Sequence, residues 1–154
     1  RCYHSSMDTP MSQGTRCRQL AEYVVFESPL NMLCDSPTNY DREEECTEFI
    51  ATIPTVWEQT VAMNGEIGKY ITMARRKGDV WYVGSLTNWD ARTLTLDLSF
   101  LGAGRWKAEM FHDGVNANRL ASDYQKTVTD IPASRKLSVK MAQGGGYALK
   151  IYKE

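Results

Sequence analysis

The chain has 154 residues, of which 42% are hydrophobic and 24% charged, and its formal net charge is -1. This composition is typical of one globular domain with a hydrophobic core, or of a domain with an appendage. The near-neutral charge gives no general attraction to nucleic acid or to an anionic membrane surface. No apolar stretch approaches the roughly 20 residues that span a bilayer. From the charge and from this length we expect neither nucleic acid nor a membrane as a partner.

The first third of the chain contains all four cysteines, at positions 2, 17, 34 and 46. They form no CxxC pair and show no zinc-ligand spacing with the two histidines. We expect free or buried thiols, although one disulfide remains open if the parent protein is exported. Because the chain starts with Arg1 and not with Met, we also expect a piece of a longer protein.

Residues 14–28 carry a helical pattern, with apolar side chains on one face at i, i+3, i+4 spacing. Gly14 or Thr15 is expected to cap its start, and Pro29 to mark its end. The short apolar run 30–34 predicts a strand buried on both faces, of the kind found in parallel sheets. The acidic residues 38–48 predict a loop that enters a short helix.

From about residue 60 the hydrophobic period changes to two, which is typical of strands. Residues 69–75 and 80–87 predict a hairpin with its turn at Gly78-Asp79, and 94–100 alternates most clearly. Further strands are expected at 106–111, 127–131, 137–141 and 147–152. About seven short strands with frequent turn signals predict an antiparallel β-sandwich.

The fold class is therefore expected to be mainly β, with two parts that meet near residues 54–60. Residues 57–154 would form the antiparallel β-sandwich. Residues 1–56 would contribute a helix, a strand and a helix, the remnant of a (β/α)8 barrel. A parallel-type strand needs neighbours on both sides, so this remnant implies that earlier units of the barrel are missing from the chain.

Several stretches together resemble the C-terminal part of glycoside hydrolase family 97. They read GTRCRQLAEYVVFESPLNMLCDSPTNY, CTEFIATIPTVWEQT, ARRKGDVWYVGSLTNWDARTLTLDLSFLG and GGGYALKI, and they extend from about residue 12 to 150. The family contains α-glucosidases and α-galactosidases, many of them from gut Bacteroidetes. The resemblance implies a parent with an N-terminal β-sandwich, a central (β/α)8 barrel and a C-terminal β domain.

In that arrangement residues 30–34 would be the eighth barrel strand. The resemblance places the catalytic carboxylates and the calcium-binding glutamates upstream, so we predict no catalytic and no metal-binding residue in this chain. It implies calcium as a cofactor of the parent, an oligosaccharide substrate, and a periplasmic or exported location.

Three residues are candidate substrate contacts: Asp35, Ser36 and Trp89. Asp35 and Ser36 would follow a barrel strand at its carboxyl end, where barrel enzymes place functional groups. The favoured alternative is that they turn the chain and cap the next segment. Trp89 lies at a predicted turn and is the best candidate for an exposed aromatic ring that stacks on a sugar.

Other polar and aromatic clusters are expected to be structural. The acidic residues 41–48 lack the ligand spacing of a calcium loop and are interpreted as a solvated loop and a helix N-terminus. The basic run 75–77 is interpreted as a solvated hairpin tip. Trp81 and Tyr82 should point to opposite faces of one strand, and packing is the expected role of both.

The first hypothesis is that this chain is the C-terminal fragment of an exo-acting α-glycoside hydrolase. It would pack against the upstream barrel, stabilise it, and be inactive alone. The alternatives are a non-catalytic carbohydrate-binding module that uses Trp89, or a dimerisation domain that makes a homodimer.

Overall fold

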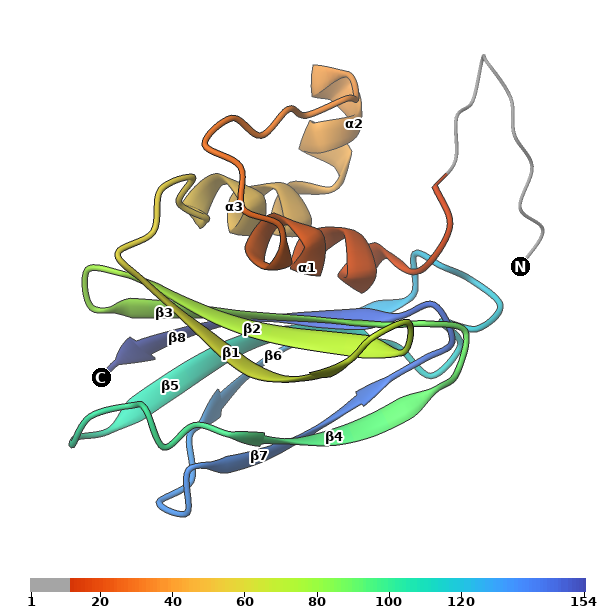
Figure 1. The fold of residues 1–154 in the computed structure, drawn as a ribbon. Coiled ribbons are helices and arrows are strands. Elements are labelled where there is room, and N and C mark those ends of the chain that lie inside the picture. Colours follow the sequence, from red (N-terminus) through yellow and green to blue (C-terminus); the bar gives the residue numbers. More distant parts are fainter. Residues whose placement is uncertain (1–11) are drawn as a thin grey trace.

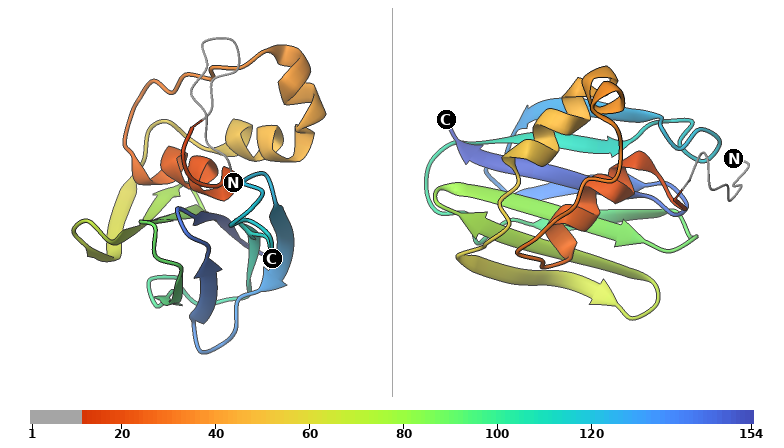
Figure 2. Two further views of the ribbon diagram at one scale, coloured as in Figure 1. Left: turned by 90° about the vertical axis from the view of Figure 1, so that its right-hand side faces the viewer. Right: turned by 90° about the horizontal axis from the view of Figure 1, so that it is seen from above.

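A computed structural model describes residues 12–154, which form three layers (Figure 1). Three helices lie over one face of a six-stranded antiparallel sheet, and a two-stranded sheet lies under its other face. The helices are α1 (Arg16–Val25), α2 (Pro37–Arg42) and α3 (Glu44–Thr52). Seen from above, α1 and α3 cross the strands of the large sheet (Figure 2).

The strands are β1 (Gln59–Glu66), β2 (Tyr70–Lys77), β3 (Val80–Thr87), β4 (Arg92–Asp97), β5 (Trp106–Asp113), β6 (Tyr124–Asp130), β7 (Lys136–Met141) and β8 (Gly146–Lys153). The large sheet has the order β1-β2-β3-β8-β5-β6, and β4 pairs with β7 in the small one. All these pairs are antiparallel, so the mainly β, antiparallel sandwich predicted from the alternation is confirmed.

The core of the sandwich lies between the two sheets. Leu96 and Leu98 project from the end of β4 onto Val83, Leu149 and other side chains of the large sheet, and all four are fully buried. Burying one such side chain contributes about 1.5–3 kcal/mol to folding. The strict alternation of leucines at positions 94–98 therefore specifies which face of this strand meets the large sheet.

A second hydrophobic cluster joins the helices to the opposite face of the large sheet. Leu20 and Val24 of α1 pack with Phe49 of α3 against Tyr82 and Phe111 of the sheet. The approach is close at Gly84 of β3, where an added Cβ would lie 2.7 Å from the carbonyl oxygen of Ala21. The helices and the sheet therefore share one continuous core.

The strands predicted for the sandwich after residue 60 are all present, most with shifted ends, and Gly78 in the turn of the β2–β3 hairpin has a positive φ of 57°. Trp81 lies in the sandwich core and Tyr82 in the helical cluster, which confirms their opposite directions. One further strand, β1, was not predicted, because it is an edge strand with little buried surface and thus no clear alternation.

The prediction of a strand at residues 30–34 is wrong in this structure. These residues belong to no strand, and Leu30 and Met32 are each 73% exposed. A strand exists only with a hydrogen-bonded neighbour, and within residues 12–154 no strand pairs with this segment.

The helical predictions hold in outline. Thr15 caps α1, and the apolar face from Cys17 to Val25 is buried as expected. The helix ends at Val25, three residues before the predicted end, where Phe26 turns extended and exposed. The acidic segment forms two short helices instead of a loop and one helix.

The described cysteines are free thiols, as expected. Cys17 and Cys46 are buried and Cys34 is exposed, whereas Cys2 lies outside the described residues. Burial raises the pKa of the Cys17 thiol, which keeps it protonated and unreactive. Within residues 12–154, no helix has the length and apolar character needed to cross a membrane.

Candidate functional site

The C-terminal end of α1 is bound to the sheet by a buried arginine. Arg75 of β2 is only 4% exposed, and its Nε donates to the carbonyl oxygen of Val24 at 2.7 Å. Its Nη2 donates to Val25 at 3.1 Å and its Nη1 to Thr60 Oγ1 at 2.9 Å. A cation at this end also complements the helix dipole. The prediction that residues 75–77 form a solvated tip is therefore wrong for Arg75.

The N-terminal end of α1 is held by the turn before β8. The Thr15 N–H donates to the carbonyl oxygen of Gly144 at 3.0 Å. Beneath this turn, Asp113 Oδ2 accepts from the N–H groups of Ala142 at 2.8 Å and Gly146 at 3.2 Å. Burial raises the pKa of the Asp113 carboxyl. Both ends of α1 are thus fixed to the β-sandwich.

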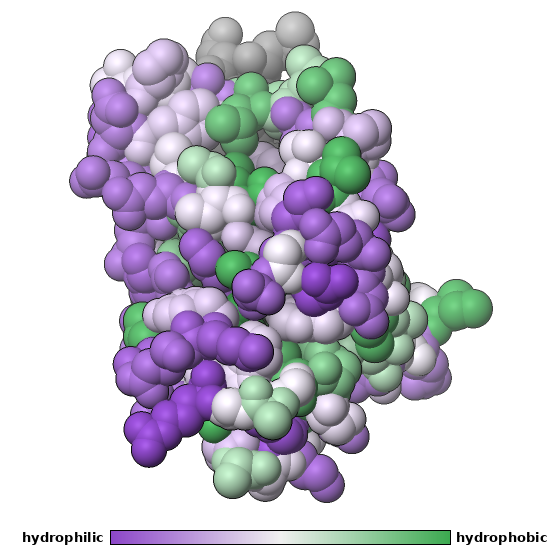
Figure 3. Space-filling model, turned by 90° about the vertical axis from the view of Figure 1, so that its left-hand side faces the viewer, coloured by the Kyte–Doolittle hydropathy of each residue, from purple (hydrophilic) through white to green (hydrophobic). Residues whose placement is uncertain are grey.

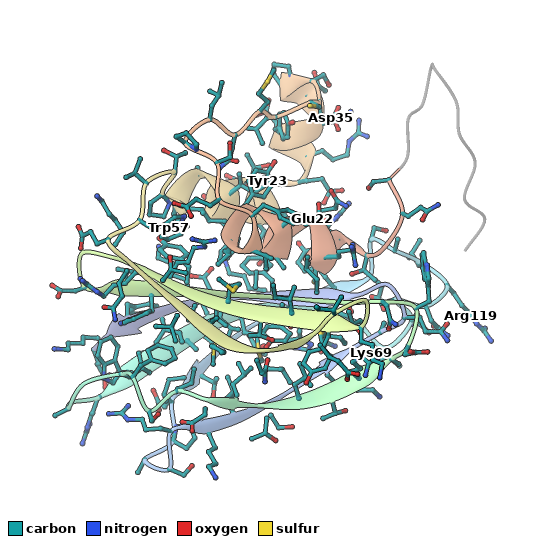
Figure 4. The ribbon with its side chains drawn as sticks, viewed as in Figure 1. Glu22, Tyr23, Asp35, Trp57, Lys69 and Arg119 are labelled. Carbon is teal, nitrogen blue, oxygen red and sulfur yellow. The ribbon has the colours of Figure 1, made fainter. Side chains whose placement is uncertain are left out.

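A groove of about 810 Å³ is lined by residues of α1, α2 and α3. Tyr23 of α1 and Asp35 line it (Figure 4), and so do Met32 and Leu33. Large apolar side chains are exposed beside it, and Figure 3 shows hydrophobic residues gathered in the upper part of this face. Such a surface is typical of an interface with another body.

Asp35 and Ser36 lie together at the start of α2, on the side of the molecule away from the sheet (Figure 4). Ser36 is the N-cap of α2 and its Oγ accepts from the Asn39 N–H at 3.4 Å. Asp35 Oδ1 accepts from the Asn39 side-chain amide and from the Ser36 N–H, each at 2.7 Å.

These two hydrogen bonds lower the pKa of the exposed Asp35 carboxyl, with the Asn39 amide as the larger cause. A general acid that works near neutral pH needs a raised pKa. The arrangement thus keeps Asp35 ionised, which suits an acceptor for hydroxyl groups or a helix cap better than an acid catalyst.

Trp89 lies apart from these residues, at the turn between β3 and β4. Its side chain is 59% exposed and lines a second groove of about 380 Å³ with Gln19, Glu22 and other residues, and Gln19 also lines the larger groove. The three predicted contact residues are therefore not in one place: Asp35 lines the larger groove, Ser36 lies next to it as the N-cap of α2, and Trp89 lines the smaller groove.

The acidic segment is used for structure. Glu43 forms an ion pair with Arg16 at 2.6 Å, and Glu45 accepts a hydrogen bond from the Tyr124 hydroxyl at 2.7 Å. Over the described part of the chain, no three or more His, Cys, Asp or Glu side chains form a group that would hold a metal ion. These residues therefore provide no site for the calcium that the resemblance implies.

The sequence pattern did not predict that Arg75 and Asp113 help to hold the two ends of α1 on the β-sandwich. Arg75 and the half-buried Arg76 are neighbours on β2, so their side chains point to opposite faces of the sheet. Asp113 sits before a glycine and is read most simply as a turn residue. Nothing local in the sequence indicates that the GGGY turn, 30 residues further on, supplies its hydrogen-bond donors.

These features together define the class of β-sandwich domains that carry an attached helical layer and an exposed apolar face. Residues 56–152 match the family model described as "Glycosyl-hydrolase 97 C-terminal, oligomerisation". The chain belongs to the glycoside hydrolase 97 family, of which it contains the C-terminal domain.

Similar proteins agree with this assignment. A retaining alpha-galactosidase from Bacteroides thetaiotaomicron is 58% identical over 149 residues, which are 97% of this chain and 22% of that protein. A family 97 enzyme from Pseudoalteromonas sp. strain K8, solved in complex with acarbose, has a TM-score of 0.85 at 37% identity. That match covers 90% of this chain and 22% of the other. A beta-arabinopyranosidase structure has a TM-score of 0.78 at 26% identity, and the match covers 92% of this chain and 22% of the other.

Proposed function

We propose that this chain is the C-terminal part of an exo-acting α-glycoside hydrolase, of the α-galactosidase or α-glucosidase class, that acts on oligosaccharides. The observation that carries the proposal is the 58% identity to a retaining alpha-galactosidase over 97% of this chain. The chain spans 22% of the length of that relative, so its own role is to stabilise the parent and the catalytic carboxylates belong to the upstream part. The higher identity to the galactosidase makes α-galactosides the first substrates to test.

The upstream barrel is the proposed partner of the exposed apolar segment. Leu30, Met32 and Leu33 are each about half exposed or more, which is unfavourable in water. Covering them would stabilise the assembly by about 25 cal/mol per Å² of apolar surface. In the parent, residues 30–34 would then gain strand neighbours and become the last barrel strand. The division of the chain into residues 1–56 and 57–154 is part of this proposal.

Asp35 and Ser36 would then lie at the carboxyl end of that strand. The hydrogen bonds of Ser36 support a capping role, while the exposed, ionised Asp35 is suited to accept a hydrogen bond from a sugar hydroxyl. If Asp35 makes that contact, Asp35→Asn in the parent should raise KM for the aryl glycoside severalfold with little change in the thermal unfolding midpoint. An unchanged KM would assign Asp35 to capping alone.

Calcium dependence and export to the periplasm are proposed for the parent as well. Their support is the family resemblance, and both are tested on the parent. A chelator should abolish turnover that added calcium restores, and cell fractionation should recover the enzyme outside the cytoplasm.

The central experiment measures hydrolysis of aryl α-galactoside and aryl α-glucoside, with and without calcium, by the full-length parent and by the 154-residue chain. We expect turnover by the parent only. Heat-labile turnover by the 154-residue chain would place catalytic groups within it, and a parent inactive on both substrates would contradict the proposed reaction.

A second candidate role is self-association, which the description of the matching family model as oligomerisation favours. We propose a homodimer. Light scattering coupled to size-exclusion chromatography should give twice the monomer mass for the parent. A mass that stays monomeric across a hundredfold concentration range would reject the dimer without affecting the catalytic proposal.

A further inference from the structure

We propose that the groove around Trp89 is a second, non-catalytic binding site for a pyranose sugar. The choice of α-galactosides and α-glucosides as ligands rests on the proposed function, whereas the site itself rests on the geometry of the turn between β3 and β4. The site lies in the smaller groove, which adjoins the groove that contains Asp35 and shares Gln19 with it, whereas Trp89 lines the smaller groove and not the larger.

The indole of Trp89 is supported on one side and open on the other. A Cβ added at Gly144 would lie 2.5 Å from Cζ3 and 2.9 Å from Cε3 of Trp89, so the six-membered ring rests on the backbone of Gly144. The side chain is nevertheless 59% exposed. A backed, solvent-facing indole offers a flat apolar surface for the C–H face of a sugar ring.

The turn that presents Trp89 is held on both flanks. The Asn88 N–H donates to the carbonyl oxygen of Lys69 at 2.8 Å, and the Asn88 carbonyl accepts from Gly144 N–H at 2.8 Å. Asn88 Oδ1 accepts from the Asp90 N–H at 3.0 Å. Because the ring is positioned before any ligand arrives, little ordering entropy opposes binding.

Polar groups of α1 face the same groove. Gln19 and Glu22 line it, and Glu22 forms an ion pair with Arg18 at 3.2 Å. Arg18 also donates to the carbonyl oxygen of Thr87 at 2.8 Å, which ties this wall to the end of β3. The amide of Gln19 can both donate to and accept from hydroxyl groups.

The balanced charge of the groove favours an uncharged ligand. The positive charge of Arg18 is balanced by Glu22, so the residues that α1 contributes to the groove carry no net charge that would attract an anion such as a phosphate. A flat aromatic face combined with balanced polar groups suits an uncharged ring with hydroxyl groups at its edge. The volume of about 380 Å³ is at the lower end of small-molecule sites and suits one or two sugar rings.

The test is an NMR titration of the ¹⁵N-labelled 154-residue chain with melibiose and, separately, with maltose. We expect one indole N–H resonance, assigned to Trp89 through the Trp89→Phe variant, to shift with a dissociation constant on the order of 1 mM. Trp89→Ala should weaken binding at least roughly tenfold, as followed by backbone amides near Gln19, and Gln19→Ala should weaken it about threefold. Val128→Ala is the control: Val128 lies on β6 and is 59% exposed, as Trp89 is, and this variant should bind like wild type.

Equal thermal unfolding midpoints would show that these variants are folded. The absence of saturable shifts with both sugars, or unchanged binding by a folded Trp89→Ala variant, would overturn the inference. The outcome is independent of turnover by the parent: an active parent without binding here removes only this site, and binding here with an inactive parent removes only the proposed reaction.

Discussion

Replacing Arg75 by Met should release the C-terminal end of α1 from the sheet. Methionine keeps much of the side-chain volume but leaves the carbonyl groups of Val24 and Val25 without the donors that reach them at 2.7 and 3.1 Å. A hydrogen bond from a charged group contributes about 1.5 kcal/mol at the low end, so the loss of both costs about 3 kcal/mol. With a urea m-value of about 2 kcal/mol/M, the unfolding midpoint should fall by about 1.5 M.

Arg76→Met is the matched control, because Arg76 is the next residue on the same strand and is partly exposed. Its ion pair with Glu58, at 3.1 Å, is of the surface kind that contributes about 0–1 kcal/mol. Urea unfolding followed by circular dichroism compares the two. If Arg75→Met lowers the free energy of unfolding by less than about 1 kcal/mol, or by no more than Arg76→Met does, then Arg75 does not hold the end of α1.

Three further predictions concern packing, thiols and pH. Gly84→Ala should lower stability by about 1–3 kcal/mol, because its Cβ would press on α1, whereas Gly102→Ala, with nothing within 4 Å, should be nearly neutral in the same urea titration. A thiol reagent should label Cys34 rapidly and Cys17 only on unfolding, measured in a Cys2→Ser background. Burial raises the pKa of Asp113, so its contribution to stability should decline as pH rises above about 4, and Asp113→Asn should remove that decline from the pH profile of the unfolding midpoint.

Each of these three predictions has an outcome that would contradict it. Equal stability of the two glycine variants would mean that α1 can move away from β3 at little cost. Labelling of Cys17 at the rate of Cys34 would show that the helical layer opens readily. For the buried carboxyl, a pH profile unchanged by the asparagine substitution would assign the decline to other groups.

Alternation along the chain was sufficient to predict most of the sandwich. Leu94, Leu96 and Leu98 show the pattern because one face of the strand is covered and the other is wet. The edge strand β1 lacks this contrast, since it is exposed along most of its length. Local pattern therefore finds strands where burial is one-sided and misses them where burial is slight.

The candidate site depends on contacts that no local pattern encodes. Arg75 is buried only because α1, 50 residues earlier, ends above it. The run 30–34 has the composition of a buried strand, yet a strand requires a neighbour, which composition does not supply. The exposure of Trp89 was expected from its place in a turn, but its grouping with Gln19 of α1 follows from tertiary packing alone.

The tight fit between α1 and β3 has a consequence for how such domains are exchanged between enzymes. A polypeptide that began at residue 57 would retain all eight strands and yet leave the apolar side chains of Tyr82, Leu86 and Phe111 without their cover. Such a piece would be prone to aggregate. Recombination that transfers the sandwich between proteins should therefore carry the preceding helices with it. The unit that folds and is transferred as a whole begins upstream of β1.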